Sequence, residues 1–195
     1  MSEEEAIRTT SPSIETLEAE LGRERHKRNY FKALRSTMAS LLIVAAAAVL
    51  VAMLVLPVLQ ITGTSMTETL QDRDIVVALR GSGYKTGDVI AFYYNNNILI
   101  KRVIATEGQW VNISEDGTVY VDDVALDEPY ISEKSKGDCN IQLPYQVPEG
   151  KVFVMGDHRA TSVDSRSTAL GCIGTDMVIG RILLRVWPLN AFGPL

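Results

Sequence analysis

An uncharged apolar segment, residues 41–59, constrains this chain more than any other feature of its sequence. As a helix rising 1.5 Å per residue it would span roughly 28 Å, about the thickness of a bilayer's hydrocarbon core. A core helix of a soluble domain would be amphipathic, whereas this segment is apolar on all sides. Cleavable signal peptides have apolar regions of roughly 7–15 residues after a short basic start. We therefore predict an uncleaved transmembrane signal-anchor over residues 38–59.

The basic residues around this segment predict its orientation. Only Arg73 is basic in the stretch that directly follows it, whereas the preceding flank is rich in cations: Arg23, Arg25, Lys27, Arg28, Lys32 and Arg35. Lysine and arginine are retained on the cytoplasmic side of a membrane. We expect a single-pass plasma-membrane protein with residues 1–36 in the cytoplasm and residues 60–195 outside the cell membrane.

The predicted cytoplasmic tail carries a weaker helical pattern. Its first ten residues are polar and acidic, which is typical of a disordered segment. Ser13 can cap a short helix in which Ile14, Leu17 and Leu21 share one face, before Gly22 interrupts the pattern. Such a helix could bind a partner or could lie on the surface without one.

After the anchor the pattern changes to short alternating segments between turn residues. Strands are predicted at 74–79, 88–94, 98–105, 110–113, 118–121, 151–155 and 177–187. Asp116-Gly117 is a strong hairpin signal, and residues 123–150 are expected to be irregular. This spacing predicts a mainly β fold, with an antiparallel barrel or sandwich-like domain over residues 60–195.

Charge and cysteine content exclude some classes of function. The formal net charge is −5 and no basic stripe is present, so nucleic-acid binding is not expected. Cys139 and Cys172 both follow the anchor, where a disulfide is permitted, and two free thiols are the alternative. Their spacing fits no zinc motif, and we expect neither a metal nor a cofactor.

Polar residues interrupt the structural pattern in three places. Ser65 stands beside Gly63 in a loop, where a serine can be a nucleophile with backbone N–H donors nearby, or simply a loop residue. Lys101 lies between apolar neighbours in a predicted strand. Partial burial there would lower its pKa and make it a base, although strand cations often reach solvent instead.

The third interruption is residues 156–166, which contain two aspartates, two arginines, two serines and a histidine. An ordinary solvated turn with an Asp–Arg pair is one interpretation. The segment directly follows a hydrophobic strand, however, and functional loops are commonly positioned by such rigid elements.

These segments, in this order after an anchor, resemble the type I signal peptidases, which are Ser/Lys proteases. The matching segments are residues 63–70 (family pattern S-M-x-P-T-L), 87–92, 101–104 and 156–166 (family pattern G-D-N-R-x-N-S-x-D-S-R). The last segment is the most specific, and the combined order is more specific than any one segment. The resemblance extends over roughly residues 30–192.

The resemblance implies a role for each matching residue. Ser65 would be the nucleophile and Lys101 its general base, with Ser162 positioning the lysine amine. Asp164 and Arg166 would pair and shape the loop beneath it. The Ser65 backbone N–H would stabilise the oxyanion; Gly63 stands where some members supply a side-chain hydroxyl. A further residue, Met66, would line the pocket for a small substrate residue.

The implied activity is that of a membrane-bound endopeptidase that removes N-terminal signal peptides from exported preproteins. The family binds its substrate as an extended strand with small residues at the cleavage site. The implied partners are thus signal peptides and the lipid bilayer, and the oligomeric state is left open.

One departure from the family pattern concerns Glu68, which replaces a proline. A carboxylate near Lys101 would raise the lysine pKa and oppose catalysis. We expect Glu68 to point to solvent or to pair with another cation.

Three alternatives stay open at the level of sequence. Ser65, His158 and Asp164 are the residue types of a Ser-His-Asp triad, which only geometry can identify. The domain could instead be a specialised or non-catalytic, membrane-tethered module for assembly of surface proteins such as pilins. It could also be a regulator that cleaves itself.

Overall fold

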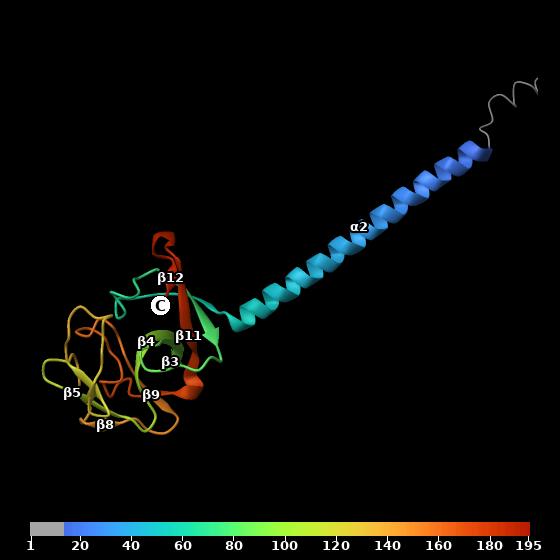
Figure 1. Ribbon diagram of the computed structural model, residues 1–195. Helices are drawn as coiled ribbons and strands as arrows, with labels where there is room; N and C mark the ends of the chain where they lie inside the picture. Colours follow the sequence, from blue (N-terminus) through green and yellow to red (C-terminus); the bar gives the residue numbers. More distant parts are fainter. Residues whose placement is uncertain (1–13) are drawn as a thin grey trace, which may run out of the picture. The chain divides into compact units, whose positions relative to one another are not determined.

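The computed structural model describes residues 14–195, and in it the chain divides into two compact units between residues 51 and 52. Helix α2 (Ile14–Val55), which Figure 1 shows as one uninterrupted helix, supplies the described residues of the first unit, and its last turn, from Ala52, belongs to the second. The predicted disorder of residues 1–10 and the predicted cap at Ser13 lie outside the described residues. An 18-residue window of α2 reaches a mean hydropathy of 2.8, so the helix has the length and composition of a membrane anchor.

Two sequence expectations for this helix were wrong. Gly22 does not interrupt it, because an isolated glycine costs a helix only about 1 kcal/mol relative to alanine. The helix also ends at Val55, short of the predicted limit at residue 59. Pro57 lacks an N–H group, and the chain turns there into strand β1 (Val58–Gln60). Pro57 O accepts a hydrogen bond from Ala78 N at 3.0 Å, which ties this turn to the next strand.

The second unit is built from antiparallel sheets, which confirms the predicted mainly β fold class. The larger sheet has the order β1-β2-β11-β3-β4-β9-β10, with β12 joined to β11. Its further strands are β2 (Ile75–Arg80), β3 (Val89–Tyr94), β4 (Asn97–Thr106), β9 (Lys151–Met155), β10 (Ile173–Gly174), β11 (Val178–Trp187) and β12 (Gly193–Pro194). Two short 3-10 helices, η1 (Thr175–Met177) and η2 (Leu189–Ala191), flank β11.

Residues between β4 and β9 form a second, smaller sheet. Its order is β7-β6-β5-β8, from β5 (Trp110–Ile113), β6 (Val119–Val121), β7 (Val124–Ala125) and β8 (Tyr145–Gln146). The predicted hairpin at Asp116-Gly117 joins β5 to β6. The segment predicted to be irregular, residues 123–150, contains only the short strands β7 and β8.

Strand β4 is the element that organises the centre of this unit. It pairs with β3 from Asn97 to Arg102, but β9 joins its other edge only from Arg102 onward. The first half of β4 therefore has one edge unpaired within the described residues. Residues of β4 belong to or pack against all three buried apolar clusters, which makes the strand a rigid support for its polar side chains.

Candidate active site

Ser65 lies in a turn within the loop that joins β1 to β2. Thr67 N donates to Thr64 O at 3.0 Å and Leu70 N to Met66 O at 2.8 Å, so the turn is closed by its own backbone. Across the site, His158 N donates to Ser65 O at 3.1 Å. These bonds leave the partly exposed Ser65 hydroxyl facing the interior of the site.

Gly63 starts this turn with a backbone that favours glycine. Its φ is +92°, and its N–H donates to Asp72 Oδ1 at 2.9 Å. A residue with a side chain would be strained in this left-handed conformation. Gly63 thus shapes the turn and offers no side-chain donor to an oxyanion.

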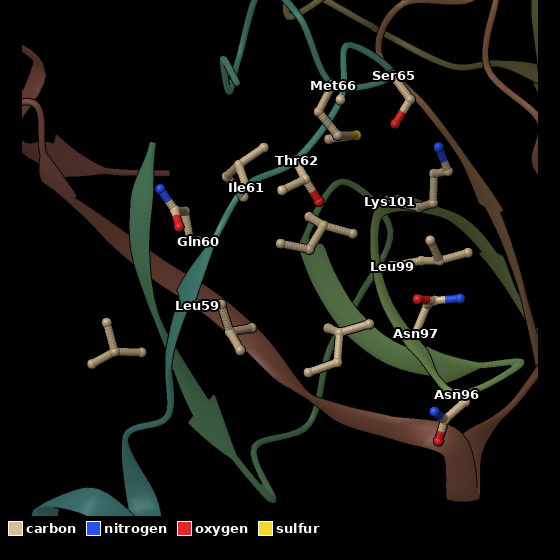
Figure 2. A pocket seen from close by; sticks show the side chains of 14 residues that line it. Leu59, Gln60, Ile61, Thr62, Ser65, Met66, Asn96, Asn97, Leu99 and Lys101 are labelled. Carbon is tan, nitrogen blue, oxygen red and sulfur yellow. The ribbon is translucent and has the colours of Figure 1, made fainter. Parts of the chain in front are cut away.

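Lys101 projects from β4 toward Ser65. Figure 2 shows the lysine amine and the serine hydroxyl pointing toward one another. The lysine is 4% exposed, and its Nζ donates to Ser162 Oγ at 3.1 Å. Burial lowers the pKa of this amine from 10.5 to about 8; the charge of Asp164 opposes the shift and that of Arg166 adds to it. An appreciable fraction of the amine is therefore neutral near physiological pH.

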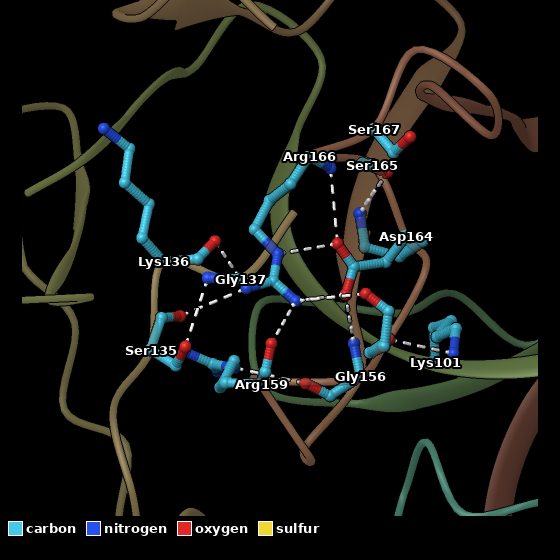
Figure 3. A network of polar contacts seen from close by, with 12 residues as sticks. Lys101, Ser135, Lys136, Gly137, Gly156, Arg159, Asp164, Ser165, Arg166 and Ser167 are labelled. Atoms are coloured by element: carbon cyan, nitrogen blue, oxygen red, sulfur yellow. Dashed lines mark hydrogen bonds and ion pairs between the residues drawn. The ribbon is translucent and has the colours of Figure 1, made fainter. Parts of the chain in front are cut away.

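Beneath the lysine, Asp164 and Arg166 form a fully buried pair. Arg166 Nε lies 2.8 Å from Asp164 Oδ1, and Gly156 N donates to Asp164 Oδ2 at 3.0 Å. Arg166 also donates to the carbonyl oxygens of Lys136 at 2.9 Å and Arg159 at 2.9 Å (Figure 3). The pair thereby cross-links the turn carrying Ser162 to the end of β9 and to the irregular segment.

Gly156 permits the close approach of these pieces. A Cβ atom at this position would lie 2.2 Å from Ser162 Oγ and 2.5 Å from Ser65 O. No side chain fits there, so this glycine lets the nucleophile turn and the Ser162 turn meet. The sequence contains the glycine, but nothing in its pattern indicated the crowding.

On the opposite face of β4, the guanidinium of Arg102 donates several hydrogen bonds. Arg102 Nη2 lies 2.6 Å from Asp157 Oδ2, and Arg102 Nη1 donates to Gly87 O at 2.7 Å. Thr69, from the nucleophile turn, accepts from Arg102 and donates to Asp157 at 2.5 Å. We did not predict this cluster; the presence of Asp157 in the most specific sequence segment was its one signal.

The segment 128–136, here named the strap, contacts the site from the irregular region. Tyr130 lies under the Arg102 guanidinium, with its ring centroid 3.8 Å from Cζ. Glu128 forms a buried ion pair with Arg159 and accepts a hydrogen bond from the Tyr130 hydroxyl at 3.0 Å. The strap thus meets the catalytic region through buried, paired polar groups.

Glu68 is exposed, which is one of the two outcomes expected for it, and its carboxylate contacts Ser132. Its carboxylate accepts hydrogen bonds from the backbone N–H of Ser132, at 2.7 Å, and from the Ser132 hydroxyl. Its φ of +98° is one that proline cannot adopt, which fits the loss of the family proline at this position. Glu68 is not among the groups that shift the pKa of Lys101.

The geometry does not assemble the alternative Ser-His-Asp triad. His158 Nδ1 lies 2.7 Å from Thr161 Oγ1. Asp164, which would have to orient the imidazole, is instead buried against Arg166 and Gly156. The two free cysteines, Cys139 and Cys172, are both half-buried and form no disulfide.

A groove of about 500 Å³ opens beside the serine and the lysine. It runs between residues 58–66 on one side and residues 96–101, along the unpaired half of β4, on the other. Met66 is 2% exposed and contributes to its wall. An extended peptide could lie between these two chain segments with backbone groups on either side.

The family model described as signal peptidase, peptidase S26, matches residues 34–187. The chain belongs to this signal peptidase family. The peptidase is 37% identical over 153 residues to signal peptidase IB of Staphylococcus aureus, a match that covers 68% of this chain and 78% of that protein. It is 32% identical over 145 residues to thylakoidal processing peptidase 1 of Arabidopsis thaliana, covering 66% and 41% of the two chains.

A signal peptidase I from Enterococcus faecalis V583 of known crystal structure is 28% identical to this peptidase. That likeness covers 51% of this chain and 97% of the other, with a TM-score of 0.42. The family match makes the protein a serine protease of the signal peptidase I type. No relative named here favours a non-catalytic module or a self-cleaving regulator.

Proposed function

We propose that this peptidase removes N-terminal signal peptides from exported preproteins with Ser65 as nucleophile and Lys101 as general base. The observation that carries this assignment is the buried lysine amine, which points toward the serine hydroxyl and has a pKa near 8. A hydroxyl is a weak nucleophile and requires a base whose pKa lies near ambient pH.

In the first half of the reaction, neutral Lys101 accepts the hydroxyl proton as Ser65 Oγ attacks the carbonyl carbon at the cleavage site. The resulting ammonium then donates that proton to the departing amide nitrogen, and the mature protein leaves with a new amino terminus. The signal peptide stays on Ser65 as an ester.

In the second half, Lys101 accepts a proton from a water molecule, which attacks the ester carbonyl. The proton returns to Ser65 Oγ as the signal peptide leaves with a carboxylate. Ser162, at 3.1 Å from Nζ, keeps the amine oriented through both halves. The Ser65 backbone N–H is the proposed donor to the oxyanion.

The groove supports binding of the signal peptide as an extended strand. The unpaired edge of β4 and the chain at residues 58–62 supply the backbone groups, and Met66 limits the space next to Ser65. Small side chains before the cleaved bond are the ones that this space favours.

The proposed topology places residues 1–36 in the cytoplasm and residues 60–195 on the outer side of the plasma membrane, with the bilayer around α2. The basic flank that precedes the apolar segment supports this orientation. Protease added to intact spheroplasts should digest the second unit and spare the tail.

Cleavage of a preprotein by the full-length enzyme in detergent tests the catalytic assignment. Wild type should produce one mature amino terminus after a small residue, and Ser65→Ala and Lys101→Ala should produce none. His158→Ala is the matched control and should retain most activity. Full activity of Lys101→Ala would contradict the assignment.

A further inference from the structure

A second hollow, of about 520 Å³, opens on the other side of the catalytic pair. It shares Ser65, Leu99 and Lys101 with the groove, and these are the residues at which the two spaces meet. The rest of its wall comes from the end of β3, the turn after it, and residues that follow Ser162.

The wall of this hollow is mainly apolar, with Ser65 and Asn95 as its uncharged polar members. Leu99, Leu170 and Tyr94 are partly buried and pack against a cluster of buried apolar residues. The Tyr94 hydroxyl donates to Ala169 O and ties β3 to the segment after the Ser162 turn. Lys101 is the one charged residue in the lining.

Val163 is the exposed part of this wall. Its side chain is 55% exposed although its neighbour Ser162, which contacts the lysine amine, is buried. An exposed valine costs little in a folded protein, but here it extends an apolar lining that begins at the nucleophile.

The direction in which the substrate chain runs follows from the position of Ser65, which borders both the groove and the second hollow. The scissile bond must lie at Ser65, which borders both, and the groove with Met66 takes the residues before the bond. The chain beyond the bond must then leave on the other side of Ser65 and Lys101, where the second hollow lies.

We propose that this hollow is a binding site for the first one or two residues of the mature protein, and that Tyr94, Val163 and Leu170 select uncharged, apolar side chains there. The inference rests on the proposed function and extends it to the leaving side of the substrate.

The test uses full-length enzyme in detergent and quenched fluorescent peptides that share one signal-peptide sequence up to the cleavage site. The first two residues after the site are varied among leucine, serine and aspartate. Wild type should cleave the leucine peptide about tenfold faster in kcat/KM than the aspartate peptide, a discrimination that apolar pockets commonly provide. Val163→Lys should erase this ratio or reverse it.

Val124→Lys is the matched control, because Val124 is similarly exposed, at 69%, but lies in the smaller sheet. It should keep the wild-type ratio. A second series, varied only before the cleavage site, should show the same preferences in wild type and Val163→Lys.

Two outcomes would overturn the proposal. One is a Val163→Lys enzyme whose rates fall equally on all peptides; the other is a change confined to residues before the bond. Failure of the proposed function is distinguishable, because wild type would then cleave no peptide, or Ser65→Ala would cleave them equally well.

Discussion

The two faces of strand β4 place two neighbouring cations, Lys101 and Arg102, in opposite environments. Lys101 is 4% exposed, and its amine contacts the neutral hydroxyl of Ser162. Arg102 is 6% exposed and lies against Asp157, Thr69 and the Tyr130 ring. Both residues are buried to the same degree, so burial alone does not decide what each cation does.

The groups that contact each cation decide whether it can act as a base. Asp164, the carboxylate that raises the lysine pKa most, is paired with Arg166, and desolvation outweighs it and lowers the lysine pKa to about 8. Arg102 has its own carboxylate within 2.6 Å, and a guanidinium does not deprotonate in proteins. One face therefore supplies a base and the other a permanent cross-link.

The comparison is tested most severely by Lys101→Arg, which retains a cation at the site. Activity should fall by about 10³–10⁴-fold, in the upper range for loss of general acid–base catalysis, because the guanidinium cannot accept the serine proton. The measurement is kcat/KM on a signal-peptide substrate, with circular dichroism to verify folding. Activity within tenfold of wild type would mean that the charge, and not the base, is what the site requires.

Arg102→Ala tests the other face. The free energy of unfolding should fall by about 3–5 kcal/mol, because Asp157 would be left buried without its partner. Urea unfolding in mild detergent can be followed by the fluorescence of Trp110 and Trp187, the only tryptophans.

Lys136→Ala is the control for this experiment. Its side chain pairs with Glu115, whose side chain is 90% exposed, and such pairs contribute about 1 kcal/mol or less. Equal losses for Arg102→Ala and Lys136→Ala would show that the Arg102 cluster is not a structural cross-link.

The pH dependence of kcat/KM sharpens the comparison. The active form has a neutral lysine, so kcat/KM should rise about tenfold per pH unit below pH 8 and level off above it. His158→Ala should leave that inflection in place. An inflection that is lost in His158→Ala would point to the imidazole as the base.

The smallest effect is expected at Glu68, which contacts neither face of β4. Glu68→Gln should change kcat/KM by less than about threefold, since an amide oxygen can still accept a hydrogen bond from Ser132. The inflection of the pH profile should also stay near 8. A strong rise in activity at neutral pH would instead show that the carboxylate acts on Lys101.

Glu68 also shows where sequence reasoning stops. The sequence indicated that this residue departs from the family pattern, and solvent exposure was expected correctly. Its hydrogen bond to Ser132 joins residues that are 64 positions apart. A local sequence pattern cannot predict a contact between segments so far apart in the chain.

The sequence by itself determined the apolar anchor, the strand pattern, and the candidate residues Ser65, Lys101, Ser162, Asp164 and Arg166. Hydrophobic periodicity and motif order are local properties, so they can be recognised before folding. Only the tertiary structure decided between the implied pair of Asp164 with Arg166 and the alternative triad with His158, and only it gave Lys101 and Arg102 opposite environments. These outcomes depend on which distant groups burial brings together, and a pKa depends on that neighbourhood more than on the residue itself.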